Sequence, residues 1–190
     1  MRSTYSLKRD YATRISGGEK KPRLLIISRK RTRKLMNVDK IAGLAEKVGF
    51  EVVVSEAAFG GVADFARIVN SCDAMMGVHG AGLTNFVFLP WNAVLIQVVP
   101  FGKLDWIASN YFGNPAKKMK LKYLEYSISE EESSLTELYG RDDPVFKDPK
   151  SIHKLGWFKM GEIYLDKQDV RLDLKRFKPV LVKTLKLLRK

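Results

Sequence analysis

Gly77-Val78-His79-Gly80-Ala81-Gly82-Leu83-Thr84-Asn85 decides the fold, because it joins a strand pattern to a helical one. The apolar segment 74–77 before it is typical of a buried strand, and residues 83–89 are typical of a short helix. A strand, a glycine turn and a helix N-terminus form an anion site, since free N–H groups and the helix dipole point at one place. A nucleotide pyrophosphate suits such a site best, although the glycines can also serve only to relieve crowding.

The spacing of the glycines excludes two common phosphate-binding motifs. Position 85 is Asn, so the run is not the dinucleotide pattern G-x-G-x-x-G, and no Lys-Ser/Thr pair follows, so it is not a Walker A loop. His79 distinguishes the run from a generic turn. At the carboxyl end of its strand it stands where ligands of open α/β sheets bind, and it can donate to a phosphate or transfer a proton. A purely structural histidine is the alternative.

Strand and helix patterns alternate along the chain. Continuous apolar runs predict strands over 23–28, 50–54, 74–77, 93–99 and 121–128. Helical spacing predicts helices over 37–49, 62–70, 83–89 and 104–111. This alternation predicts an α/β domain with a Rossmann-like parallel sheet.

The two ends of the chain have a different character. Residues 1–22 are polar and basic, and we expect a short helix and a linker there. Residues 23–190 then form the α/β domain. Its end, 169–190, is amphipathic and predicts a C-terminal helix that starts near Pro179 and caps the core.

The segment after Ile128 is polar and predicts a long loop, which in a compact domain is functional or pairs with another element. Glu131 and Glu132 within it could contact a substrate or belong to a lid, but their pattern fits a plain polar loop equally well.

The formal net charge of +13 is unevenly distributed over the 190 residues. Residues 1–36 carry a net charge of +10 and residues 37–115 one of −3. A basic stretch favours an anionic partner, whether nucleic acid, a membrane surface or a phosphorylated substrate, and a solvated surface is the alternative. Nucleic acid is the least favoured partner, because the charge lies in the linker and tail and no aromatic-basic RNA motif occurs.

Several classes are excluded by simple counts. The chain has one cysteine, Cys72, and two histidines, so neither an intrachain disulfide nor a Cys/His zinc site is expected. No stretch approaches the roughly 18 apolar residues of a transmembrane helix. The first residues also lack the apolar region of a secretory signal.

Three stretches together resemble the C-terminal part of the plant-type glycosyltransferases of family 61. They are 24–29 with Arg33, the signature 78–90, and 164–170 with 176–179. The resemblance covers nearly the whole chain, and such plant proteins are similar to xylan arabinosyl- and xylosyltransferases.

The resemblance implies the donor-binding half of a GT-B enzyme that resides in the Golgi lumen. Residues 23–190 would then be its nucleotide-sugar-binding domain, and 1–22 a linker or helix from an N-terminal domain outside this sequence. The resemblance also implies inverting transfer of a pentose or another sugar from a UDP-sugar to a cell-wall polysaccharide such as xylan, or to a glycan, without an essential metal or other cofactor. No Asp-x-Asp occurs in the chain, and that pair is what a metal-bridged sugar-nucleotide site would need.

The expected UDP-sugar-binding residues lie at the carboxyl ends of three strands: Glu56, Arg29, Arg33, His79, Gly80, Ala81, Gly82, Leu83, Thr84 and Asn85. We expect Arg29, assisted by Arg33, to neutralise charge on the β-phosphate while the N–H groups of 80–83 face the diphosphate.

The remaining candidates have weaker assignments. His79 is expected to donate to a phosphate or sugar oxygen, and Thr84 and Asn85 to be polar contacts or first-turn caps. Glu56 is a candidate for a ribose hydroxyl by analogy with other nucleotide-binding sheets, with a surface carboxylate as the alternative.

An inverting transferase also needs a general base. His79 is the only candidate here, and phosphate contact suits it better, so we expect the base in the N-terminal domain. The alternative is a truncated, inactive module that binds UDP without transferring sugar, and its association with other transferases stays open.

Overall fold

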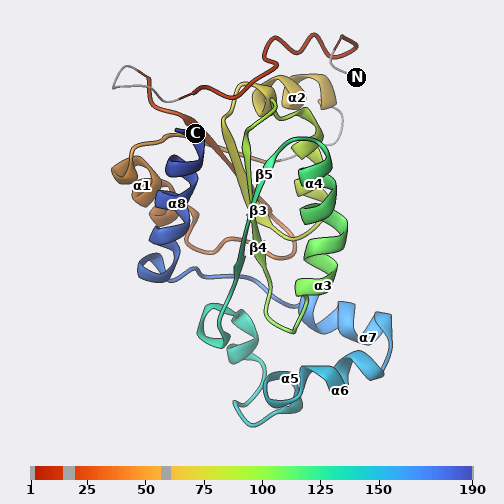
Figure 1. Cartoon of the computed structure of the whole chain (residues 1–190). Coiled ribbons are helices and arrows are strands. Elements are labelled where there is room, and N and C mark those ends of the chain that lie inside the picture. The colour runs from red at the N-terminus through yellow and green to blue at the C-terminus, as the bar shows by residue number, and fades with distance from the viewer. Residues whose placement is uncertain (1–2, 15–19, 57–60, 190) are drawn as a thin grey trace.

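The computed structural model describes residues 3–14, 20–56 and 61–189 and contains one parallel sheet of five strands in the order β2-β1-β3-β4-β5 (Figure 1). The strands are β1 Arg23–Ser28, β2 Glu51–Glu56, β3 Ala74–Val78, β4 Val94–Val99 and β5 Lys122–Ser127. The α/β expectation is confirmed. This strand order is the second common doubly wound order, rather than the 3-2-1-4-5-6 order of dinucleotide-binding sheets.

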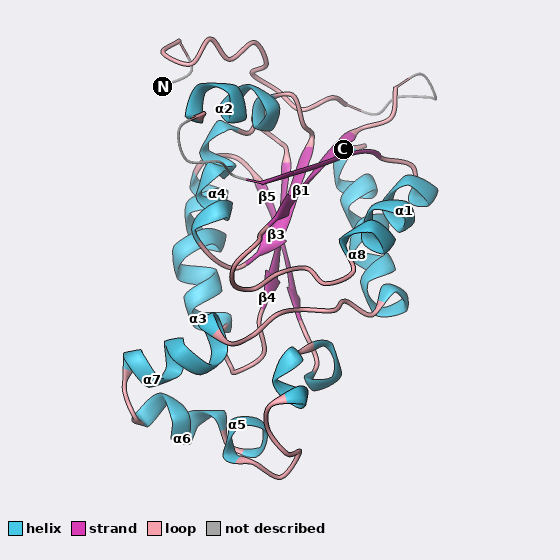
Figure 2. Cartoon of the chain, turned by 180° about the vertical axis from the view of Figure 1, so that it is seen from behind, coloured by secondary structure: helices cyan, strands magenta, loops and turns pink. Residues whose placement is uncertain are grey.

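The helices lie on both faces of the sheet and beyond the carboxyl ends of its strands. They are α1 Val38–Val48, α2 Val62–Asn70, η1 Ala81–Phe88, α3 Asp105–Ala108, η2 Ser109–Gly113, α4 Asn114–Lys118, η3 Glu130–Glu132, η4 Ser134–Glu137, α5 Pro144–Lys147, α6 Pro149–Lys154, α7 Trp157–Gly161, η5 Glu162–Asp166 and α8 Leu174–Leu188. Helices α1 and α8 cover one face, and α2, α3 and α4 cover the other (Figures 1 and 2).

Two apolar layers hold these helices on the sheet. Ile41 of α1 and Phe177 and Leu181 of α8 pack on one face, and Phe65 and Val69 of α2 pack on the other. The inner strands are buried on both faces, as their continuous apolar sequences indicate. A ligand can therefore reach the inner strands β3 and β4 only at their ends.

The segment predicted as a long loop instead folds into short helices, so that prediction was wrong. Pro144 and Pro149 start α5 and α6, and the carboxylates of Asp143 and Asp148 accept hydrogen bonds from the first-turn N–H groups. These helices bury a third apolar cluster that includes Tyr164. They lie beyond the carboxyl ends of the strands, at the bottom of Figure 1.

Glu132 is a structural residue of this segment. Its side chain is 3% exposed, and it accepts hydrogen bonds from the Tyr126 hydroxyl (2.6 Å) and from the backbone N–H groups of Ser129 (2.8 Å) and Asp173 (2.6 Å). It also pairs with the guanidinium of Arg176. A buried carboxylate with four donors ties β5 and η3 to the start of α8.

Helix α8 begins earlier than its proline indicates. Asp173 caps it by accepting from the N–H groups of Lys175 and Arg176, so the start predicted near Pro179 was wrong by about one turn. The predicted C-terminal helix itself is confirmed.

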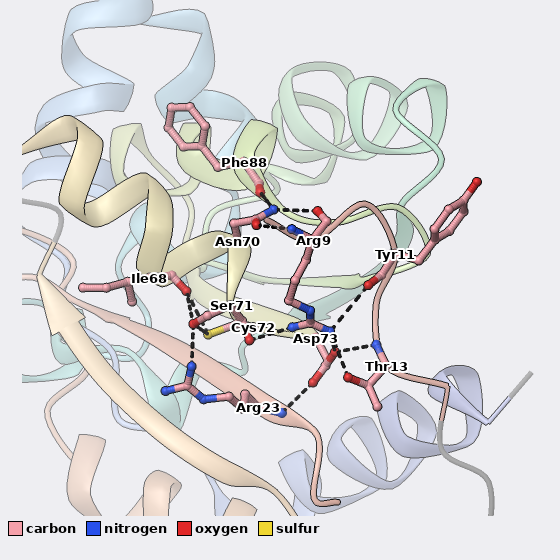
Figure 3. A network of polar contacts seen from close by, with 10 residues as sticks. All are labelled: Arg9, Tyr11, Thr13, Arg23, Ile68, Asn70, Ser71, Cys72, Asp73 and Phe88. Carbon is pink, nitrogen blue, oxygen red and sulfur yellow. Dashed lines mark hydrogen bonds and ion pairs between the residues drawn. The ribbon is translucent and has the colours of Figure 1, made fainter. Parts of the chain in front are cut away.

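The N-terminal segment runs across the amino ends of the strands. The helix predicted within residues 1–22 is absent from 3–14 and 20–22, and residues 1–2 and 15–19 lie outside the described residues. The Asp73 carboxylate accepts from the Arg9 guanidinium (2.5 Å) and from the N–H groups of Thr13 (2.7 Å) and Arg23 (2.9 Å), as Figure 3 shows. Asn70 bonds both the N–H and the C=O of Arg9 (Figure 3). Residues 3–14 are thus fixed at the amino ends of the strands, whereas the glycine turn lies at their carboxyl ends.

Candidate functional site

The site lies where the chain leaves β1 and β3, which are neighbours in the sheet. The connection after β1 leads to α1 on one face, and the connection after β3 leads to η1 against the other. A crevice forms at the carboxyl ends of strands at such a switch in winding direction, and ligands of open α/β sheets bind there. Arg29 directly follows β1 and His79 directly follows β3.

Gly80 brings the two arginines together. Its φ of 143° is a conformation that favours glycine, and a Cβ built on it would lie 2.8 Å from Arg29 Nη1 and 3.0 Å from Arg33 Nη1. Arg33 Nη1 also donates to the C=O of His79 (3.1 Å). Arg33 itself has a φ of 54°, which is uncommon for a residue with a Cβ. The local backbone is thus shaped to hold both guanidinium groups over the glycine turn.

These guanidinium groups are incompletely paired. Arg29 donates from Nε and Nη2 to the C=O and hydroxyl of Thr32 (2.8 and 3.1 Å), and Arg33 Nε is buried without a partner among the described residues. No described carboxylate forms an ion pair with either arginine. Burial, and then the charge of Arg29, lower the pKa of Arg33 to about 10, and burial lowers the pKa of Arg29. Two adjacent cations with free donors suit a bound anion.

The backbone of the glycine turn adds further donors. Within the described chain, the N–H groups of Gly80, Ala81 and Gly82 have no acceptor, whereas Leu83 donates its N–H to the C=O of Gly80 (2.9 Å). The N–H of Leu83, which we also expected to face the diphosphate, thus already has an acceptor, because η1 is a 3₁₀ helix whose first bond uses that donor. Three consecutive free N–H groups remain. We call these N–H groups and the guanidinium groups of Arg29 and Arg33 the anion site.

Gly82 has a packing role beside this one. A Cβ on it would lie 3.0 Å from Ile27 Cγ2, so its lack of a side chain lets η1 approach β1. The crowding alternative raised for these glycines therefore holds for Gly82, and Gly80 is the residue that faces the arginines.

Thr84, Asn85 and Glu56, three of the expected UDP-sugar-binding residues, have partners close by in the structure. Thr84 donates to the C=O of Ala81 (2.6 Å) and Asn85 to that of Gly82 (3.0 Å), so neither is the expected first-turn cap of η1. Their hydroxyl and amide hydrogens bond back one turn instead. Glu56 ends β2 and pairs with Lys30 Nζ (2.8 Å), which gives it a partner on the surface.

His79 is buried and lies at the end of a polar chain. Its Nδ1 lies 2.7 Å from Gln97 Nε2, Gln97 Oε1 lies 2.8 Å from the Tyr123 hydroxyl, and that hydroxyl lies 2.8 Å from Glu125 Oε2. The ring of Phe112 meets the imidazole edge-on, with 5.2 Å between ring centroids. We call His79, Gln97, Tyr123 and Glu125 the polar chain.

The polar chain was not predicted from the sequence. Its one visible signal is Gln97, a fully buried amide in the apolar run of β4, since a buried polar side chain must find partners. Burial, and then the charges of Arg33 and Arg29, lower the pKa of His79 to about 4. The imidazole is therefore neutral at neutral pH.

The described residues hold neither a cluster of metal ligands nor a helix able to cross a membrane. In residues 3–14, 20–56 and 61–189, no three His, Cys, Asp or Glu side chains are grouped as metal ligands. No helix in these ranges has the length and apolar character needed to cross a bilayer.

Comparison with known proteins shows which family this chain belongs to. The family described as Glycosyltransferase 61 matches residues 4–96. The rice alpha-1,3-arabinosyltransferase XAT3 is 54% identical over 97% of this chain and 32% of its own length, and the rice beta-1,2-xylosyltransferase XYXT1 is 51% identical over 97% and 40%. The Arabidopsis thaliana xylan glycosyltransferase MUCI21 is 44% identical over 86% and 33%. The chain belongs to glycosyltransferase family 61.

The matches with the curated relatives cover most of this chain but only part of each relative. The chain spans about a third of the length of the curated relatives it matches. Among solved structures, an oxidoreductase from Corynebacterium diphtheriae matches with a TM-score of 0.48 and 10% identity, over 90% of this chain and 98% of that one. This likeness is too distant to bear on function.

Proposed function

We propose that this chain is the donor-binding part of an inverting glycosyltransferase that uses a UDP-sugar. The observation that carries the proposal is the anion site at the carboxyl ends of β1 and β3, in which Arg29 and Arg33 meet beside Gly80 and three consecutive N–H groups have no described acceptor. Planar guanidinium groups and N–H groups at a helix N-terminus are the donors that bind phosphate groups best. A diphosphate presents enough oxygens to use all of them.

The same groups supply the chemistry that the transfer needs. As the bond between the sugar and the β-phosphate breaks, negative charge grows on the leaving UDP. Arg29 and Arg33 stabilise this charge from fixed positions, which is why we propose transfer without an essential metal. Stabilisation of a developing charge by preorganised donors lowers the barrier, and binding of the ground state alone does not.

The substrates and setting of the reaction belong to the proposal. Relatives named as arabinosyl-, xylosyl- and xylan glycosyltransferases support transfer of a pentose or another sugar to xylan, a related cell-wall polysaccharide or a glycan. We propose a GT-B arrangement in the Golgi lumen, in which a second domain faces the crevice and carries the base that deprotonates the acceptor hydroxyl.

A second candidate function is a UDP-binding module that does not transfer sugar. The observation that favours it is the pKa of His79, which burial and the two arginines lower to about 4 and which makes this residue a weak base. Release of UDP from UDP-xylose or UDP-arabinose in the presence of xylan oligosaccharides distinguishes the enzyme from the module.

Calorimetry with UDP tests the proposed function. Arg29→Ala should weaken binding by about 1–3 kcal/mol, the size of a lost hydrogen bond to a charged group. Arg31→Ala is the matched control, because Arg31 is exposed in the same loop and should bind UDP as the wild type does. Equal UDP affinity of Arg29→Ala and the wild type would refute the proposal.

A further inference from the structure

We propose that Gln97, Tyr123 and Glu125 hold the hydrogen of His79 on Nδ1, so that Nε2 is a hydrogen-bond acceptor for a hydroxyl group of the nucleotide sugar. The three are positioning residues that act through His79. The identity of the ligand rests on the proposed function, whereas the position of the hydrogen in the free protein does not.

The polar chain is built from three adjacent strands. His79 follows β3, Gln97 lies in β4 and Tyr123 and Glu125 lie in β5, where Gln97 and Glu125 are paired in register. Gly113 fixes the Tyr123 ring from the other side, because a Cβ on this glycine would lie 3.0 Å from Tyr123 Cε1. The side chains therefore meet through the register of the sheet and the packing around it.

The direction of the hydrogen bonds follows from counting hydrogens. The Tyr123 hydroxyl has one hydrogen and two acceptors at 2.8 Å, Gln97 Oε1 and Glu125 Oε2. Burial, and then the bond to Glu125, raise the pKa of Tyr123, so the phenol keeps its hydrogen. An ionised carboxylate only accepts, and it accepts more strongly than a neutral amide oxygen. The hydrogen therefore goes to Glu125.

This choice determines the orientation of the Gln97 amide. With its hydrogen on Glu125, the Tyr123 oxygen must accept from Gln97, since two facing oxygens with no hydrogen between them repel. A 180° turn of the amide exchanges the positions of its nitrogen and oxygen and keeps the same contacts. The amide oxygen then faces His79 Nδ1, and Nδ1 must carry the hydrogen.

The other ring nitrogen is left for a ligand. Because the imidazole is neutral, one hydrogen on Nδ1 means that Nε2 has none. No hydrogen bond to Nε2 occurs among the described residues. A bare nitrogen accepts from a hydroxyl and repels a phosphate oxygen. This reverses the expectation that His79 donates to the ligand: it leaves the phosphates to the anion site and gives His79 a ribose or sugar hydroxyl.

Nitrogen-15 NMR of the histidine side chains in the ligand-free chain at pH 7 tests this assignment. The chain has two histidines, so the spectrum of His153→Gln assigns the signals of His79. We expect a His79 Nδ1 that carries hydrogen and an Nε2 that does not. A single tautomer with the hydrogen on Nε2 would overturn the proposal.

Glu125→Gln tests the role of the distant carboxylate. The new amide can donate to the Tyr123 oxygen, which frees the phenol hydrogen for Gln97, so the Nε2–H tautomer should appear. Tyr126→Phe is the control, because this hydroxyl lies in the same strand and bonds Glu132. It should leave the His79 signals unchanged. An unchanged tautomer in Glu125→Gln would show that the polar chain does not position His79.

Addition of UDP and of UDP-xylose separates this proposal from the proposed function. A shift of Nε2 with UDP identifies a ribose hydroxyl, and a shift only with UDP-xylose identifies a sugar hydroxyl. If both ligands bind and Nε2 gains a hydrogen or does not shift, the role of His79 is refuted. If neither binds, the proposed function fails and the tautomer result stands.

Discussion

Arg29 and Arg33 approach one point, since their Nη1 atoms lie 2.8 and 3.0 Å from the position that a Cβ would take on Gly80. Two partly buried cations this close repel each other and destabilise the free protein, although the charge of Asp166 offsets part of this effect at Arg33. A diphosphate between them relieves this repulsion. The arrangement therefore favours binding of an anion at some cost to stability, as functional sites commonly do.

Gly80→Ala should weaken UDP binding roughly tenfold or more, because the added Cβ displaces both guanidinium groups and the free N–H groups beside them. Gly156→Ala is the matched control, since Gly156 also has a positive φ, 99°, but open space around it. Both variants should lose on the order of 1 kcal/mol of stability from the strained φ. Calorimetry with UDP and urea unfolding measure the two effects, and equal UDP affinities of the two variants would argue against the anion site.

His79 should make stability depend on pH. Its pKa falls from 6.5 to about 4 on folding, so between these values the unfolded chain binds a proton that the folded chain does not. The contribution of His79 to the free energy of unfolding is fully present above pH 6.5 and is lost as the pH falls to 4. It amounts to about 3 kcal/mol.

Urea unfolding between pH 7 and pH 4 checks this pH dependence. His79→Asn should lose about 3 kcal/mol less than the wild type over this range. The same loss in His79→Asn and the wild type would contradict the lowered pKa.

Glu132→Gln should destabilise the protein by on the order of 3 kcal/mol, because an amide replaces a buried carboxylate that accepts from four donors. Glu131→Gln is the matched control, since Glu131 is exposed and lies 3.8 Å from Arg141. It should change stability by less than about 0.5 kcal/mol. Thermal or urea unfolding of the two variants measures this difference. Equal losses of stability would show that Glu132 does not anchor α8.

Asp73→Asn should also cost on the order of 3 kcal/mol, because Arg9 and two backbone N–H groups lose their charged acceptor. Asp64→Asn removes an exposed pair with Arg67 and should have little effect. UDP affinity should be unchanged in both variants, since Asp73 lies at the amino ends of the strands. Loss of UDP binding in Asp73→Asn with stability retained would place part of the site there.

The strands and the place of the site could be predicted from the sequence because both depend on local pattern. Continuous apolar runs fix buried parallel strands, and the residue after each strand lies at the carboxyl edge whatever the strand order. Arg29 and His79 were located in this way. The role of Gly82 against Ile27 depends on how close η1 packs, which no local pattern gives.

The polar chain, the course of the N-terminal segment and the short helices after Ile128 could not be predicted, because they depend on contacts rather than on local pattern. Gln97 and Glu125 meet only because β4 and β5 pair in one register. The segment 3–14 is held by hydrogen bonds to Asp73 and Asn70, which lie far away in the sequence. The short helices after Ile128 depend on capping residues and on a shared apolar cluster. The residues of this cluster are separated by polar residues in the sequence, so no apolar pattern predicts it.

Backbone NMR of the labelled chain during a UDP titration tests the anion site most directly. The account predicts that the amide signals of Gly80, Ala81 and Gly82 shift most, with a common midpoint, while that of Leu83 shifts less because its N–H already bonds Gly80. UDP binding that leaves these three signals unchanged and shifts others would contradict the account.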